Sequence, residues 1–310
     1  MDSKKLGHLA LFSVAATYAA NYLLAKGLMP NLIQPSGFVF ARITGALILF
    51  LPILLLSGVQ KIKKEHWLRV ALCGVFGVGI NQLFFFNGLN LTSPLNSALI
   101  ITSVPIIVLV ISALFLKAGI TSRKVAGVFI GAAGAMSLIY LGQSAAGSSG
   151  SSWKGDLFVL INATSYSIYL IIVKPLMVHY KPITVLFWAF AVGWVLVAPF
   201  GMSQFFEVDW SQYTGNNFFA FGFVVVMATF LVYLMNIFAL KHLPSTTVSV
   251  YIYLQPTLVI LFTFLFFYLG LNDFRADLTW AKAGCALLIF VGVYLVSFEG
   301  KKKKMVKRPS

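Results

Sequence analysis

Arg42 is the one charged residue that lies well inside an apolar stretch, the run at 36–57. If that run crosses a membrane, a guanidinium there is costly and is by default a candidate functional group. It can hold a carboxylate through two parallel hydrogen bonds, which predicts that it attracts the carboxylate of a substrate. The alternative is that the side chain snorkels outward or hydrogen-bonds carbonyls at a helix end.

Polar and aromatic side chains recur at helical spacing in two other apolar stretches. Tyr18 and Asn21 are three residues apart and so share one helix face, and Tyr166 and Tyr169 repeat that face later in the chain. Lipid cannot satisfy such groups, so we expect the face to point inward. There it either lines a substrate cavity or bonds to another helix.

Two further residues complete the predicted site. Gln82 is a polar residue in a third apolar stretch, and Trp188 lies away from the interfacial belt that tryptophan prefers. Trp188 is either part of an aromatic pocket or an ordinary packing residue. The predicted substrate-binding residues are Arg42, Tyr18, Asn21, Gln82, Tyr166, Tyr169 and Trp188.

Groups that could support catalysis or ion coupling are absent from the middle of the apolar stretches. The acidic residues and the histidines lie at the ends of these stretches, in loops or near the termini, and Cys73 and Cys285 form no metal or redox spacing. The chain has no Walker loop and no nucleophile elbow. We therefore predict no enzyme activity, no cofactor and no metal. We also predict transport down a gradient, because no buried carboxylate is available for ion coupling.

The composition identifies the elements that must hold these residues. Of the 310 residues 59% are apolar and only 10% are charged, and the mean hydropathy is +0.91. A soluble domain carries about a quarter charged residues, so an ordinary soluble enzyme and a disordered chain are both excluded. At roughly 20 residues per span, the sequence predicts ten membrane helices. They fall at about 7–26, 36–57, 66–89, 94–116, 122–141, 155–177, 182–203, 216–240, 246–269 and 279–298.

The positive charges predict the orientation of these helices. Most of the 23 lysines and arginines lie in alternate loops or in the basic tail at 299–310, and therefore on one side of the membrane. By the positive-inside rule both termini are cytoplasmic, which requires an even number of spans. The net charge of +15 thus reflects topology, and we predict no nucleic-acid partner.

The chain also contains an internal repeat. Residues 7–45 align with 155–193, and Pro105 later falls opposite Pro256 in the fourth and ninth spans. Each half has five spans, so the second half enters the membrane from the opposite side, which is a recurrent architecture of secondary transporters. The two prolines either act as hinges or make static bends. The predicted units are 1–146 and 147–298, each a five-helix repeat, and the tail 299–310.

These features together resemble the drug/metabolite transporter superfamily, and within it the EamA-type permeases. The resemblance rests on the five-plus-five arrangement, the segment 38–42 early in the second span, and the prolines Pro105 and Pro256. It also rests on the glycine-rich fifth span and its counterpart, namely Gly127, Gly131, Gly134, Gly284 and Gly292. The sequence departs from many relatives near Lys117 and Gly270, where they carry a glutamate. The resemblance implies a permease of a bacterial cytoplasmic membrane, commonly an exporter of amino acids or other small metabolites.

The sequence therefore predicts an all-α membrane protein with a polar and aromatic cavity between two inverted five-helix halves. We expect it to transport small metabolites, amino acids being favoured, by rocking the halves in alternating access. The expected partners are a small-molecule substrate and the lipid bilayer, and the expected state is a monomer or a weak homodimer. The alternatives are a nucleotide-sugar translocase, a lipid-carrier translocase with a lateral polar groove, and an intramembrane enzyme that clusters Asp156, Asp273 and histidines.

Overall fold

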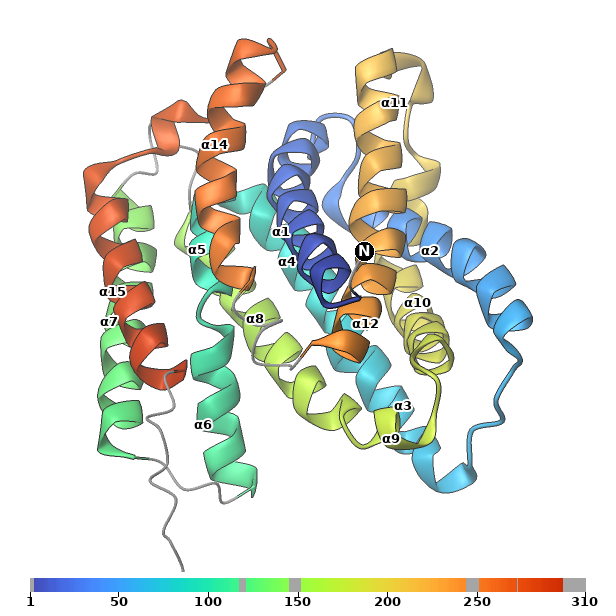
Figure 1. The fold of residues 1–310 in the computed structure, drawn as a ribbon. Coiled ribbons are helices and arrows are strands. Elements are labelled where there is room, and N and C mark those ends of the chain that lie inside the picture. The colour runs from blue at the N-terminus through green and yellow to red at the C-terminus, as the bar shows by residue number, and fades with distance from the viewer. Residues whose placement is uncertain (1–2, 117–120, 145–151, 244–250, 272, 298–310) are drawn as a thin grey trace, which may run out of the picture.

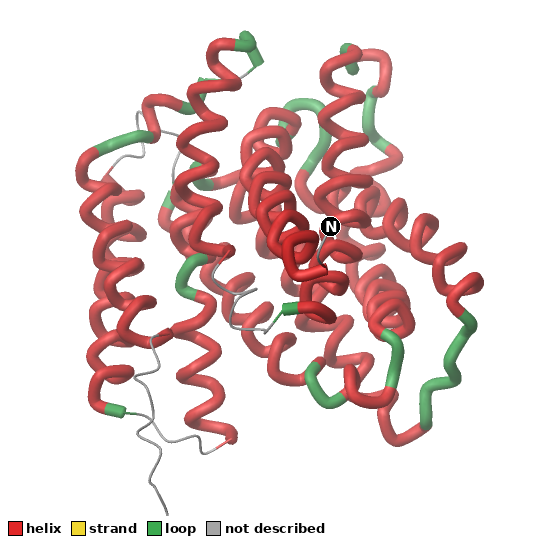
Figure 2. The backbone as a smooth tube through the Cα atoms, viewed as in Figure 1, coloured by secondary structure: helices red, strands yellow, loops and turns green. Residues whose placement is uncertain are grey.

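The computed structural model describes residues 3–116, 121–144, 152–243, 251–271 and 273–297, and all regular elements in these ranges are helical (Figures 1 and 2). In this part of the chain nine helical segments are long and apolar enough to cross a membrane, and a shorter apolar helix, Trp280–Val296, completes the set. The all-α membrane fold is thus confirmed. The basic tail 299–310, the boundary segment 147–151 and Lys117 lie outside the described residues.

The helices follow the predicted spans closely. The first half contains α1 (Ser3–Leu28), α2 (Pro35–Ser57), α3 (Trp67–Gly74), the π-helix η2 (Val75–Gly79), α4 (Ile80–Leu91), α5 (Pro94–Ile101), α6 (Val104–Leu116) and α7 (Ser122–Ser144). The second half contains α8 (Trp153–Val173), α9 (Leu176–His179), α10 (Pro182–Phe206), α11 (Gly215–Gly222), the π-helix η4 (Phe223–Leu231), α12 (Val232–His242), the 3₁₀ turn η5 (Tyr251–Tyr253), α14 (Leu254–Tyr268), the 3₁₀ turn η6 (Arg275–Asp277) and α15 (Trp280–Ser297). We call the end of the bundle where α1 ends and α15 begins the distal end, and the opposite end the proximal end.

Several helices begin at residues that suit a helix start. Ser93 precedes α5, and its Oγ accepts a hydrogen bond from the Asn96 amide at 3.1 Å, while Pro94 occupies the first helical position. Ser152 precedes α8 and accepts from Lys154 in the same way. These caps satisfy amides that have no partner within their own helix. They fix where the fourth and sixth spans enter the membrane.

The fourth span is broken rather than gently kinked. Pro105 follows the gap between α5 and α6 and has no N–H to donate to the preceding turn. The Thr102 and Ser103 hydroxyls instead donate to the carbonyls of Leu99 and Ile100, each at 2.6 Å. The predicted bend at Pro105 is therefore a two-residue interruption of the helix.

Pro256 has a related position in the ninth span. It lies in the first turn of α14, directly after η5, where the missing N–H leaves no hydrogen bond unmade. Both prolines thus lie at the start of a new helical segment. Their role as hinges stays a prediction.

The two sequence halves are interleaved instead of standing side by side. Helix α1 packs against α12 and α14 of the second half, and α8 packs against α4, α5 and α6 of the first half (Figure 1). Helices α2 and α10 pack together, as do α7 and α15, so counterpart helices meet across the repeat. The two halves therefore do not form separate bodies. Each packed group mixes helices from both repeats.

Glycines bring α7 and α15 into close contact. A Cβ atom built on Gly292 would lie 2.5 Å from the Gly131 Cα atom, and one on Gly127 would lie 2.7 Å from the Gly292 carbonyl oxygen. Such distances leave no room for a side chain, which is how small residues let membrane helices approach. The glycine-rich fifth and tenth spans thus pack closely against each other.

Candidate functional site

Arg42 lies inside the helix bundle on α2, with 4% of its surface exposed. Its Nε and Nη2 atoms donate to Thr229 Oγ1 at 2.9 and 2.7 Å, and its guanidinium lies 4.2 Å from the centre of the Phe86 ring. No carboxylate forms an ion pair with it in the described part of the chain. The structure contradicts the snorkelling alternative, because a hydroxyl and an aromatic face hold the charge in the interior.

Thr229 is presented to Arg42 by a π-helix, η4. Its Oγ1 atom donates to the carbonyl of Val224, five residues earlier, at 2.8 Å. The hydroxyl hydrogen is therefore used within η4, and the lone pairs of the oxygen are left to accept from Arg42. π-helices are rare and often occur at functional sites. The sequence analysis did not identify Thr229, because nothing in an apolar run of this kind distinguishes a π-turn from an α-turn.

The other π-helix, η2, occupies the corresponding place in the first half. The alignment that places Gln82 opposite Tyr233 brings η2 opposite η4. In η2 the carbonyl of Phe76 accepts a hydrogen bond from Ser165 Oγ of α8 at 2.6 Å. Both π-helices therefore use a side-chain hydroxyl to satisfy a main-chain carbonyl. They do so in the middle of the third and eighth spans, on the two sides of the interior.

Four tyrosines gather in the interior near Arg42. Tyr18 and Tyr233 lie close enough to Arg42 to interact with it electrostatically, and Tyr166 lies close to both. The rings of Tyr166 and Tyr169 are stacked with their centres 6.0 Å apart. The structure thus brings three of the predicted residues, Tyr18, Tyr166 and Tyr169, into one cluster.

These four tyrosines retain accessible surface although they lie deep between helices. In the described residues, none of their hydroxyl groups has a hydrogen-bond partner, and none is fully enclosed. A buried hydroxyl without a partner is unfavourable, so these groups must meet water or a ligand. The cluster formed by Arg42, Tyr18, Tyr166, Tyr169 and Tyr233 is therefore the candidate site, which we call the interior cluster.

The remaining predicted residues lie at the edge of this cluster or outside it. Asn21 is buried, with 2% of its surface exposed, and its Oδ1 atom has no partner in the described residues. Gln82 donates to Asn81 at 2.9 Å, in a contact region between the third and sixth spans. Trp188 packs edge-to-face against Trp67 of α3, with ring centres 5.1 Å apart. Among the described residues, neither Gln82 nor Trp188 forms a hydrogen bond or a cation–π contact with Arg42.

Tyr22 is a further interior residue that the sequence analysis missed. Its hydroxyl donates to Gln255 Oε1 at 3.1 Å, and this bond joins α1 to α14. Tyr22 lies four residues after Tyr18 and so shares its helix face, a spacing that could have identified it.

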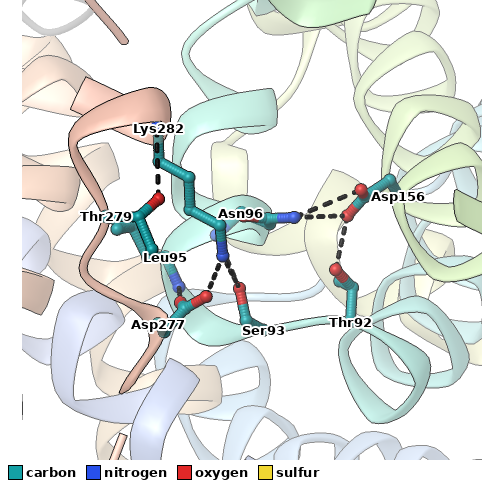
Figure 3. A network of polar contacts seen from close by, with 8 residues as sticks. All are labelled: Thr92, Ser93, Leu95, Asn96, Asp156, Asp277, Thr279 and Lys282. Carbon is teal, nitrogen blue, oxygen red and sulfur yellow. Dashed lines mark hydrogen bonds and ion pairs between the residues drawn. The ribbon is translucent and has the colours of Figure 1, made fainter. Parts of the chain in front are cut away.

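A second polar cluster occupies the distal end (Figure 3). Asp156 is completely buried and accepts a hydrogen bond from the Thr92 hydroxyl. The side-chain amide of Asn96 also donates to it, at 3.2 Å. Asp277 is 5% exposed and pairs with Lys282. Both acids lie near helix starts, as predicted. Both carboxylates are buried because the loops and helix ends around them are folded into the protein, and neither lies at mid-span, where ion coupling is predicted to need one.

The intramembrane-enzyme alternative receives no support from these positions. Asp273 does not join Asp156, because it is exposed and pairs with Arg275 at 3.0 Å, whose hydrogen bonds lower the pKa of Asp273. Among the described residues no three His, Cys, Asp or Glu side chains are grouped as a metal would require. His8 and His66 bond to tyrosines at the proximal end instead, namely Tyr251 and Tyr180.

A lateral groove of about 390 Å³ lies among α5, α14 and α15. Its wall is mostly apolar, and Lys282 at its edge is already paired with Asp277. Residues of the wall include Leu95, Leu99, Pro256, Ile260, Ala283 and Phe290. This is not the lateral polar groove that a lipid-carrier translocase would need.

Comparison with known proteins identifies similar membrane transporters. The model of the EamA-like transporter family matches the chain twice, at residues 5–140 and 153–298. An uncharacterized transporter of Archaeoglobus fulgidus is 25% identical over 96% of this chain and 98% of its own length. The uncharacterized transporter YyaM of Bacillus subtilis is 21% identical over 83% of this chain and 85% of its own length. A WAT1-related protein of Arabidopsis thaliana is 28% identical over 57% of this chain and 54% of its own length.

A solved crystal structure has the same fold. It superposes with a TM-score of 0.59 at 17% sequence identity and covers 94% of this chain and 97% of the other. Two family matches in tandem agree with the internal repeat.

Proposed function

Because the chain belongs to the EamA-like transporter family and is a multi-pass membrane transporter rather than an enzyme, we propose that it carries small carboxylate-bearing metabolites, with amino acids as the favoured substrates. The observation that carries this proposal is the buried guanidinium of Arg42, which faces no carboxylate among the described residues. A substrate carboxylate is the anion that would neutralise it.

The rest of the interior cluster suits a zwitterion. A buried charge is stabilised only when it is paired and hydrogen-bonded, so Arg42 favours an anionic group beside it. The free hydroxyls of Tyr18, Tyr166, Tyr169 and Tyr233 can accept hydrogen bonds from a substrate ammonium, and their ring faces attract a cation. Highly anionic substrates such as nucleotide sugars would need more than one interior cation.

The transport cycle follows from the inverted repeat. Two repeats related by inversion can exchange conformations, which opens the interior cluster first to one side of the membrane and then to the other. Pro105 and Pro256 stand at the helix interruptions where such a motion would bend the chain. We place the protein in a bacterial cytoplasmic membrane, with both termini in the cytoplasm, acting as a monomer or a weak homodimer.

Counterflow in proteoliposomes tests this proposal. The purified protein is reconstituted with pooled unlabelled amino acids inside, and labelled amino acids are added outside without any ion gradient. We expect labelled substrate to accumulate transiently, and we expect Arg42→Gln to abolish this exchange. Arg69→Gln is the matched control, because Arg69 is exposed at the start of α3. No exchange by the wild type, with or without a proton gradient, would refute amino acids as substrates, and full exchange by Arg42→Gln would remove Arg42 from the site.

A further inference from the structure

Polar contacts join several elements at the distal end of the bundle, and Figure 3 shows those of Asp277 and Lys282. Asp277, just before α15, accepts the amide of Leu95 in the first turn of α5 at 3.3 Å. Lys282 of α15 pairs with Asp277 and donates to Ser93 Oγ at 3.5 Å. Nearby, Lys26 at the end of α1 donates to the carbonyl of Asn90 at 2.6 Å. Apart from the pair of Lys282 with Asp277, these contacts join segments that are far apart in the sequence.

These contacts connect two packed groups of helices. In one group α1 packs against α12 and α14, and α2 packs against η4. In the other group α8 packs against α4, α5 and α6, and α10 packs against α3 and η2. The groups also meet where α2 packs against α10. The bond from Lys26 crosses from α1 to α4, and the bond to Asp277 crosses from α5 to the segment after α14. The distal contacts therefore hold the two groups together at one end.

The hydrogen bonds of Asp156, unlike those of Lys26 and Asp277, do not cross between the two groups of helices. Asp156 of α8 bonds to Thr92 and Asn96, so it acts within one group. At the proximal end His8 bonds to Tyr251 at 2.9 Å, which likewise joins α1 to η5 within the other group. Asp156 and His8 are counterparts in the internal alignment. Each stabilises its own group, so neither closes the pathway.

Asp277 and Lys282 suit the start of α5 for a clear physical reason. The first amides of a helix have no partner within the helix and carry a partial positive charge, which a carboxylate stabilises. Asp277, which lies far from α5 in the sequence, provides that carboxylate, and the positive charge of Lys282 balances the negative charge of Asp277. Both side chains are about 5% exposed, so water does not compete for these bonds in the closed arrangement.

The other half of the repeat has no equivalent pair. The alignment of the glycine-rich fifth and tenth spans places Ile120 opposite Asp277 and Val125 opposite Lys282. The first half of the sequence therefore has no counterpart of the Asp277–Lys282 pair at the aligned positions. The two repeats share a fold but differ in the side chains at these two positions.

We propose that Asp277 and Lys282 form a clamp that keeps the distal end of the transport pathway closed and biases the empty carrier toward the state that opens proximally. The proposal rests on the alternating access of the proposed function. Two symmetric repeats would give the two states similar free energies, so an asymmetric contact sets their populations. When the distal end opens, water replaces the partners of both side chains, which makes the closure reversible.

Distance measurements between spin labels test the clamp without any substrate. The background carries Cys73→Ser and Cys285→Ser, since both native cysteines are buried and unpaired. One pair of labels spans the two groups at the distal end, on exposed sites at the ends of α4 and α14. A second pair spans them at the proximal end, on exposed sites at the start of α1 and in α9. The label sites are Leu91 with Tyr268, and Leu6 with Val178.

The clamp variants are Asp277→Asn and Lys282→Met, each made in the full-length protein in lipid nanodiscs. In the wild type we expect the short distal distance to dominate. A hydrogen bond to a charged group contributes enough that each variant should raise the ratio of distally open to distally closed protein about tenfold or more. The proximal distance should shorten in the same samples. Asp273→Asn is the matched control, because this acid is exposed and pairs with Arg275.

Each result decides between the clamp and a purely structural role. Opening in both clamp variants, with Asp273→Asn and Asp156→Asn unchanged, supports the proposal. A mainly long distal distance in the wild type overturns it, as do folded clamp variants with wild-type distances. Equal opening in Asp156→Asn also overturns it, because the effect would then be general loosening. Counterflow is measured separately, so a failure of the substrate proposal leaves these distances interpretable.

Discussion

Thr229→Val is the perturbation that most directly tests how Arg42 is held. The Thr229 hydroxyl accepts hydrogen bonds from two nitrogen atoms of Arg42, at 2.9 and 2.7 Å, and donates to Val224 at 2.8 Å. Valine has nearly the same shape but no hydroxyl. The variant therefore leaves a buried guanidinium facing a methyl group, and it leaves the carbonyl of Val224 without its donor.

The expected magnitude follows from these bonds. A hydrogen bond to a charged group contributes about 1.5–3 kcal/mol in a protein. Two such bonds end on one oxygen, and the guanidinium can turn toward the hydroxyls of Tyr18 or Tyr233, so the losses are not additive. We therefore expect a loss of about 2 kcal/mol in the binding of a carboxylate substrate. This corresponds to an affinity roughly thirtyfold weaker.

The assay compares three proteins with the labelled amino acid that the wild type exchanges best. Counterflow rates over a range of substrate concentrations give the apparent affinity of the wild type, Thr229→Val and Thr229→Ser. The serine variant keeps the hydroxyl, so we expect it to remain within a few-fold of the wild type. A folded Thr229→Val protein with wild-type affinity would refute the argument that this hydroxyl positions Arg42.

Three further predictions concern packing and are checked by thermal unfolding of the purified protein, with counterflow as the second readout. Gly292→Val should lower the free energy of unfolding by about 1–3 kcal/mol, because the added side chain overpacks against Gly131. Gly284→Ala should leave the stability unchanged, because nothing lies within 4 Å of a Cβ atom at that position. Equal melting temperatures for the two variants would contradict the tight contact of α7 and α15. Tyr22→Phe should cost about 1 kcal/mol by breaking the bond to Gln255, and an unchanged melting temperature would show that this bond contributes nothing. Trp188→Phe should lower the melting temperature through lost packing on Trp67 and leave counterflow intact, and loss of exchange at normal stability would return Trp188 to the site.

Much of the fold is predictable from the sequence because membrane spans appear in it as long runs of high hydropathy. Lipid requires each span to be an apolar helical segment long enough to cross the membrane, so span number, span limits and the internal repeat are all visible in the sequence. The interruption near Pro105 is visible too, since proline removes a main-chain donor. The interleaving of the halves is not visible, because it depends on which helix faces meet.

The candidate site is predictable only in part. Arg42, Tyr18 and Tyr166 stand out because polar groups in a span must face the interior. Thr229 does not stand out, because its role depends on the π-turn that aims its hydroxyl at Arg42. The burial of Asp156 is hidden for a similar reason: the sequence places it at a helix start, and only the packing of α8 against α4 and α5 encloses it.

The internal repeat explains why the site has a charge on one side only. In the alignment Arg42 of α2 falls opposite Phe190 of α10. Phe190 is buried and packs edge-to-face on Tyr233, with ring centres 5.0 Å apart, so the second half contributes an aromatic wall where the first contributes a cation. An inverted repeat needs two similar scaffolds in order to exchange conformations, but a substrate with one carboxylate needs only one guanidinium. A second interior arginine at position 190 would repel the first and would favour a doubly charged anion. We therefore expect Phe190→Arg to lose amino-acid exchange even if it folds, and exchange that survives this change would argue against a carboxylate bound between α2 and α10.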